Sequence, residues 1–130
     1  MAGNEDAVRA LLQRFADAFT SGDGPGAAAC WEVPALVVSQ EGTRAVNALE
    51  EVAAFFGGAQ AQYHQQGVTG TRPEVQGIDW HTDQLASVTV RWPYLDGEGH
   101  ELGRSERSVY LLRVHEGAPH ICAAVLLGAQ

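Results

Sequence analysis

The pattern of apolar residues changes its period once along the chain, near residue 68. Before that point apolar residues recur three and four positions apart, as they do along one side of a helix. After it they tend to alternate, as they do in strands. Helices followed by an antiparallel meander are typical of α+β proteins. Because 130 residues suffice for one domain with its own core, we expect a single α+β domain over residues 1–130.

Three helices are expected before residue 68. The first has Asn4 as its N-cap, two acids in its first turn and Gly22 at its C-terminal end. A short second helix is expected over residues 25–31, because proline is favoured in a first turn, and Pro34 is expected to end it. The apolar stripe of the first helix consists of Val8, Leu11, Leu12, Phe15 and Phe19.

The third helix is expected to begin after Asn47. Glu50 follows Asn47 by three residues, as in a capping box, and an apolar stripe then runs from Leu49 to Tyr63. Gly57 and Gly58 lie inside this helix, where two glycines cost about 2 kcal/mol of helix propensity. We therefore expect a kink, a break or a close packing contact at the glycine pair.

Six strands complete the expected fold. Two short strands flank a tight turn at residues 41–42, and four longer strands are joined by short hairpin-like turns. A long twisted sheet wrapped round helices forms a cone whose open end can bind a small ligand. The sequence thus predicts a cone-shaped, strongly curved mixed or antiparallel sheet around three N-terminal helices. The expected strands are residues 35–40, 43–46, 71–81, 84–95, 101–115 and 119–127.

The charge and the missing motifs exclude several classes of partner. Sixteen acidic and eight basic residues give a net charge of -8, which disfavours nucleic acids and anionic membranes. The N-terminus lacks the pattern of a secretory signal and no apolar run could span a membrane, so a cytoplasmic location is expected. Cys30 and Cys122 are then expected to be buried free thiols. No metal is expected, and no cofactor, because no zinc-type spacing and no nucleotide-binding glycine motif occurs.

Two segments and the order of the elements resemble a known superfamily. ALLQRFADAFTSGD, residues 10–23, and SVYLLRVHEGAPHICAAV, residues 108–125, resemble the first helix and the closing hairpin of nuclear transport factor 2-like proteins. The similarity is greatest to their SnoaL-like and ketosteroid-isomerase-like branch. It implies a cystatin-like α+β cone with a small-molecule pocket. It does not imply one activity, because this fold carries isomerases, cyclases, dehydratases, hydrolases and binding modules without catalysis.

The resemblance also indicates which catalytic groups this chain lacks. Ketosteroid isomerase needs a carboxylate base and two acidic groups that donate to an enolate oxygen. By alignment with that enzyme, the donor tyrosine falls at Phe15, the base at Ser39 and the second acid at Tyr110. Phenylalanine cannot donate a hydrogen bond, and a serine hydroxyl is a poor base. Steroid isomerisation is therefore not expected.

Glu106 and Tyr110 form the most interesting polar pair. The same alignment places Tyr110 on the pocket face of its strand, and strand alternation gives Glu106 and Ser108 that face too. Glu106 could act as a base and Tyr110 as a donor. The interpretation that we favour is structural: Glu106 pairs with Arg104 or Arg72, and Tyr110 is a core residue with a satisfied hydroxyl. His64, at the end of the third helix, is a further catalytic candidate.

The aromatic residues indicate a pocket for an apolar or aromatic small molecule. Three functions remain open: a ligand-binding protein, which we favour, an isomerase-, cyclase- or dehydratase-type enzyme that uses Tyr110 and Glu106, and an association module without a ligand. The expected ligand contacts are Phe15, Phe19, Trp31, Ser39, Phe56, Tyr63, Trp92, Ser108 and Tyr110.

The last two strands also predict a homodimer. Val109 and Leu111 are apolar on the face opposite Tyr110, and residues 121–127 are apolar throughout. A sheet with one solvated face should instead alternate between apolar and polar residues. The outer face would therefore expose a large apolar patch unless a second copy covers it. The resemblance implies the same sheet-to-sheet pairing.

Overall fold

The first apolar stripe forms helix α1, Glu5–Ser21, in a computed structural model that describes residues 5–129. Val8, Leu11 and Leu12 are at most 1% exposed and contribute to the core cluster. Gly22 follows the helix with a φ of 72°, a left-handed conformation that glycine adopts without strain. The expected N-cap, Asn4, lies outside the described residues.

The second helix is shorter than expected, because the chain turns into a strand before Pro34. Helix α2 is Gly24–Ala28, and the Asp23 carboxylate caps it by accepting a hydrogen bond from the Gly26 amide at 3.0 Å. Strand β1, Trp31–Ser39, contains Pro34. Its pairing with strand β6, Ala118–Ala129, is irregular between residues 31 and 36. Proline is tolerated there because its missing N–H removes no regular ladder bond.

Helix α3, Leu49–Gln65, is continuous through both glycines. Its N-cap is Ala48, one residue later than expected, and the Glu51 carboxylate accepts from the backbone amides of residues 47 and 48 at 3.0 Å each. Of the three outcomes expected for the glycine pair, the structure has the packing contact. A Cβ on Gly57 would lie 4.0 Å from the Cα of Gly24. Because neither residue has a side chain, α2 can pack closely against α3 at this point.

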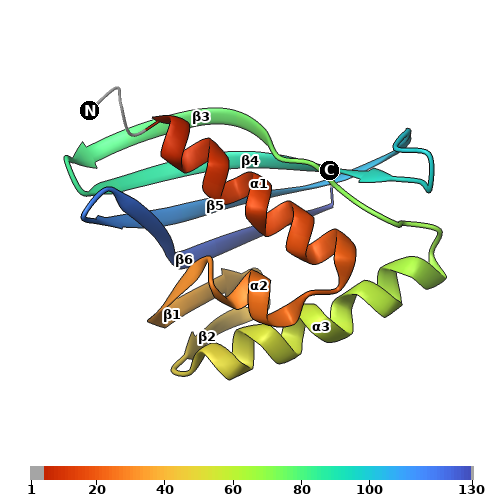
Figure 1. Ribbon diagram of the computed structural model, residues 1–130, viewed down its shortest axis with the longest axis horizontal. Helices are drawn as coiled ribbons and strands as arrows, with labels where there is room; N and C mark the ends of the chain where they lie inside the picture. The colour runs from red at the N-terminus through yellow and green to blue at the C-terminus, as the bar shows by residue number, and fades with distance from the viewer. Residues whose placement is uncertain (1–4, 130) are drawn as a thin grey trace.

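The remaining strands form the expected meander within one mixed sheet. The strand order is β2-β1-β6-β5-β4-β3, and the pairing is antiparallel except between β1 and β6, which run parallel. Figure 1 shows α1 lying across one face of the sheet, with α3 on the side of β1 and β2. The fold class expected from the sequence is thereby confirmed. The other strands are β2, Gly42–Val46, β3, Glu74–Thr82, β4, Leu85–Leu95, and β5, Glu101–His115.

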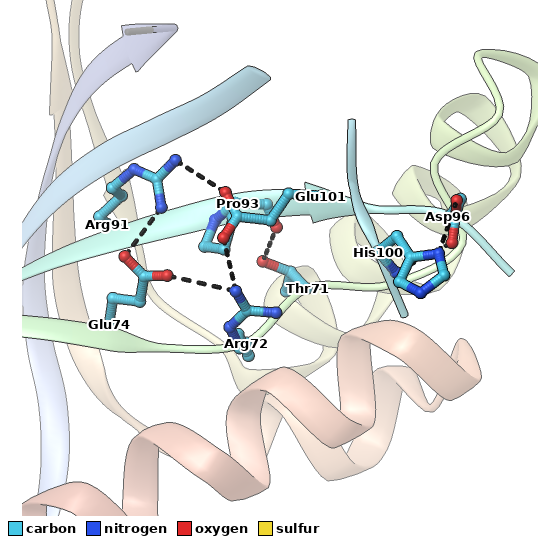
Figure 2. A network of polar contacts seen from close by, with 8 residues as sticks. All are labelled: Thr71, Arg72, Glu74, Arg91, Pro93, Asp96, His100 and Glu101. Carbon is cyan, nitrogen blue, oxygen red and sulfur yellow. Dashed lines mark hydrogen bonds and ion pairs between the residues drawn. The ribbon is translucent and has the colours of Figure 1, made fainter. Parts of the chain in front are cut away.

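Strand β3 begins three residues later than expected. The chain before it is held to β4 by one isolated antiparallel bridge, between Gly70 and Leu95, and by side-chain contacts. The Thr71 hydroxyl donates to the Pro93 carbonyl at 2.8 Å. Arg72 pairs with Glu101 at 2.6 Å, and Arg91 pairs with Glu74 at 2.8 Å and with Glu101 at 3.1 Å (Figure 2). This network ties the segment after α3 to β4 and β5.

The two faces of the sheet differ in the way that the sequence predicts for β5. Residues 108, 110, 112 and 114 are buried against the helices, whereas Val109 and Leu111 are only half-buried. Leu36 of β1 is 47% exposed, and its register partner Ala123 and the next pair, Val38 and Val125, extend the same outer surface. An apolar stripe thus crosses β1, β6 and β5. Beyond it, β4 presents half-buried polar residues at 87, 89 and 91.

Both cysteines are buried free thiols, as expected. Burial raises the pKa of the Cys30 thiol and of the Cys122 thiol. Such thiols are protonated at neutral pH and therefore act as small apolar core groups.

Candidate ligand-binding site

A cavity of about 640 Å³ lies between α1, α3 and the inner face of the sheet. The cavity has room for a drug-sized ligand, because such sites usually measure about 300–1,000 Å³. All nine expected contact residues line it, and their role as ligand contacts stays a prediction. They are Phe15, Phe19, Trp31, Ser39, Phe56, Tyr63, Trp92, Ser108 and Tyr110.

Phe15 stands at the centre of the aromatic wall. Its ring makes edge-to-face contacts with Phe56 at 5.0 Å, Trp92 at 6.1 Å, Tyr110 at 6.2 Å and Trp31 at 6.3 Å between centroids. Such pairs contribute about 0.5–1.5 kcal/mol each beyond their buried area. The rings come from α1, α3 and three strands, so packing between all of these elements holds the wall in shape before any ligand enters.

Tyr110 is a buried phenol with a satisfied oxygen, as the structural interpretation expects. The Trp92 indole N–H donates to its hydroxyl at 3.0 Å, and Ser108 also hydrogen-bonds to it. Burial raises the pKa of Tyr110 to about 12, although both hydrogen bonds act in the opposite direction. Tyr110 is therefore neutral at physiological pH. The phenol oxygen thus has two hydrogen-bond partners within the protein, Trp92 and Ser108.

The expected ion pair between Glu106 and Arg104 or Arg72 does not form. The Tyr63 hydroxyl donates to Glu106 Oε1 at 2.9 Å. Arg72 is instead held by Glu74 and Glu101. The Arg104 guanidinium lies 5.5 Å above the centre of the Tyr94 ring. Glu106 therefore faces phenols from α3 and β4 where a cation was expected.

Tyr63 and Tyr94 share the neighbourhood of this carboxylate. Their ring centres are 5.6 Å apart. Burial, and then the negative charge of Glu106, raises the pKa of Tyr63 to about 12. Burial, and then a hydrogen bond to Glu106, raises the pKa of Tyr94 above that of Tyr63. Both phenols are therefore proton donors and neither can serve as a tyrosinate base.

Glu106 and Tyr110 line the same cavity but stand apart. They are four residues apart on one face of β5, which separates their Cα atoms by about 13 Å. One elongated ligand in the cavity can therefore contact both groups.

Several lining residues were missed by the sequence analysis. Tyr94 shares the inner face of β4 with Trp92, and that alternation could have identified it. Phe55 and Leu126 line the cavity although they are 56% and 39% exposed, so they mark its opening. Arg44 and Arg107 also line it, and no motif indicated them.

His64 lies away from the cavity. It is exposed near the C-terminal end of α3 and is not among the described residues that line the cavity, so its catalytic role stays an untested prediction. The part of the chain that the structure describes contains no group of three or more potential metal ligands. Within residues 5–129, no helix is both long and apolar enough to cross a lipid bilayer.

Solved structures share this architecture. A domain of unknown function with a cystatin-like fold from Nostoc punctiforme is 26% identical, with a TM-score of 0.73 over 98% of this chain and 78% of that one. An NTF2-like protein of unknown function from Shewanella oneidensis is 15% identical, with a TM-score of 0.71 over 95% and 98% of the two chains. A ketosteroid isomerase-like protein from Erwinia carotovora is 15% identical, with a TM-score of 0.67 over 95% and 94%.

The sequence comparisons agree with the structural ones. No curated protein matches this sequence significantly. A family model described as NTF2-like protein DUF6841 matches residues 4–128. The superfamily that the two quoted segments resemble is thereby confirmed.

Proposed function

We propose that this chain, which belongs to the NTF2-like family DUF6841, binds an apolar or aromatic small molecule in the cavity under its sheet. The observation that carries the proposal is the Phe15-centred aromatic wall around a space of about 640 Å³. A module that only associates with a second copy needs no such space, and the same side chains would be expected to fill it.

The residues at the three aligned catalytic positions support binding over steroid isomerisation. Phe15 is 5% exposed and packs in the aromatic wall, where it offers no hydrogen-bond donor. The Ser39 hydroxyl accepts from the Glu41 amide at 3.3 Å, and no base activates it within residues 5–129. Tyr110 alone retains an acidic proton, and one donor without a base does not move a proton between carbon atoms.

An enzyme that uses Glu106 and Tyr110 is the second candidate. It is favoured by one observation: a carboxylate and a neutral phenol line the same cavity. Native mass spectrometry of the purified protein addresses this alternative. A copurifying compound that stays chemically unchanged on incubation supports binding alone. Its conversion by the wild type, but not by Glu106→Gln, would establish the enzyme.

We further propose that the chain forms a homodimer through the outer face of the sheet. The apolar stripe of Leu36, Val38, Ala123 and Val125, with the neighbouring side chains of β5, supports this pairing. Pairing of two such stripes about a two-fold axis would remove both from water. A cytoplasmic location remains a prediction.

The direct test of the ligand site is a pair of tryptophan substitutions on α3. Ala59 lines the cavity, whereas Ala54 is exposed and outside the described lining. N-phenyl-1-naphthylamine, a neutral dye whose fluorescence rises in apolar sites, serves as the probe. We expect the wild type to bind one dye per chain saturably. The affinity for the dye should fall at least about tenfold in Ala59→Trp and stay unchanged in Ala54→Trp. Absence of saturable binding, or equal loss in both variants, would contradict the proposal.

A further inference from the structure

Glu106 is an ionisable group that the proposed apolar pocket does not explain. Its carboxylate is half-buried and receives a hydrogen bond from Tyr63 at 2.9 Å. Within residues 5–129, Glu106 forms no ion pair with any arginine or histidine. A half-buried carboxylate is stabilised by hydrogen bonds, but its charge remains uncompensated by neutral phenols.

Aromatic rings surround this carboxylate. Tyr63 packs edge to face with Phe19 at 5.2 Å and against Tyr94 at 5.6 Å between ring centres. Phe55, more than half exposed, lies at the same opening. Ring faces attract organic cations through their quadrupole, and the attraction grows where water is excluded. A carboxylate within a set of aromatic rings has the composition that recognises ammonium groups.

A second, smaller cavity places this group at the edge of the main one. It measures about 420 Å³, and Glu106, Tyr63 and Tyr94 line both spaces. Among its described lining residues Glu106 is the charged one; the others there are apolar, amide or phenolic. A ligand can therefore place its apolar body in the main cavity and a polar end beside Glu106.

The basic residues nearby are arranged in a way that leaves Glu106 available. Arg104 lies over the Tyr94 ring and donates to the Gln66 carbonyl at 3.5 Å. Arg44 lies 3.8 Å from Glu51. Arg107 lines the main cavity but is absent from the lining of the smaller one. The net charge of -8 further favours the approach of a cation over that of an anion.

We propose that Glu106, with Tyr63 and Tyr94 around it, binds the protonated amine of a ligand whose aromatic or apolar body fills the main cavity. This inference rests on the proposed ligand-binding function of that cavity. It adds the chemical class of the ligand, which the apolar lining alone leaves open.

The experiment compares three probes that share one aromatic body. 1-Naphthylmethylamine is a cation at neutral pH, 1-naphthalenemethanol is neutral and 1-naphthoic acid is an anion. Isothermal titration calorimetry with the wild-type protein should give a dissociation constant for the amine at least about tenfold below that for the alcohol. This comparison needs no substitution, so it does not depend on the folding of a variant.

Two variants then assign the preference to the carboxylate. Glu106→Gln should weaken binding of the amine to about the level of the alcohol and leave the alcohol unchanged. Glu98→Gln is the matched control, because the Glu98 side chain is 82% exposed in the turn between β4 and β5. It removes the same charge from the protein and should keep the preference.

The outcomes separate the two proposals. Equal binding of amine and alcohol, unchanged in Glu106→Gln, would refute the amine site and leave the apolar pocket standing. Tightest binding of the acid would refute it in favour of an anion held by Arg44 or Arg107. Failure of all three probes, together with failure of the neutral dye, would overturn the pocket itself and the amine site with it.

Discussion

All three tyrosines of the chain line the cavity, which allows the site to be tested by titration alone. Tyr63, Tyr94 and Tyr110 are the complete set of phenols in the sequence, and burial is the first cause that raises the pKa of each. The perturbation is an increase of pH, and the readout is the near-ultraviolet absorbance of tyrosinate. No label, ligand or variant is needed.

The magnitude follows from the pKa values. With a pKa of about 12, Tyr63 and Tyr110 are each about one-tenth ionised at about pH 11, whereas an unfolded tyrosine of pKa about 10 is about nine-tenths ionised. Tyr94 should ionise still less in the folded chain. When the protein unfolds in urea at that pH, the three phenols should ionise together. The tyrosinate absorbance should therefore rise in one step by most of the amount expected for three tyrosines.

The same difference predicts loss of stability in alkali. The folded pKa lies above the unfolded one, so stability is unaffected below about pH 10 and falls as the pH rises toward 12. For the fully buried Tyr110 the loss over this window is on the order of 2–3 kcal/mol. Urea unfolding at stepwise increasing pH measures it, and Tyr110→Phe should flatten the slope. Full ionisation of the folded protein near pH 10, with stability unchanged, would refute the burial of these phenols.

Two further predictions concern packing and assembly. Gly24→Ala should destabilise the fold by about 1–3 kcal/mol in urea unfolding, because its Cβ would overlap the Ala53 carbonyl oxygen, whereas Gly58→Ala meets nothing and should stabilise α3 by about 0.5–1 kcal/mol. A similar effect of both substitutions would contradict the close approach of α2 and α3. In sedimentation at micromolar concentration the wild type should have roughly twice the mass of one 13.9 kDa chain. Leu111→Arg, on the outer face of the sheet, should give the monomer. A monomeric wild type would show that the apolar stripe stays exposed to solvent and would refute the dimer.

The elements could be predicted from the sequence because their signals are local. The α1 stripe is periodic over many residues, and β5 is bounded by glycine-containing turns, so its bounds were predicted to the residue. The predicted bounds are wrong where contacts between residues distant in sequence determine the local structure. Pro34 is compatible with a helix end, but an irregular pairing with β6 allows it inside β1. Thr71 has strand propensity, but its hydroxyl bonds to Pro93, 22 residues away, and the strand starts later.

The cavity lining could also be predicted, for a physical reason. In a sheet wrapped round helices, large aromatic residues on the inner faces of α1, α3, β4 and β5 converge, whatever the detailed angles between those elements. Phe15, Trp92 and Tyr110 satisfy this rule and meet within 6.2 Å of one another, centre to centre. Convergence of faces is a property of the pattern, and the pattern is visible in the sequence.

The partner of Glu106 could not be predicted in the same way. Arg104 is two residues from Glu106 on the same strand, so it was the nearest expected partner for the carboxylate. Instead Tyr63, 43 residues away on α3, donates the hydrogen bond to Glu106. An arginine side chain is long enough to reach several acceptors, and here ring contact with Tyr94 and the Gln66 carbonyl hold it. Polar partners depend on ångström-scale distances between elements. Strand alternation therefore placed Glu106 on the pocket face, but it could not show that a phenol from α3, and no arginine, would face the carboxylate. The proposed preference for an amine depends on this arrangement.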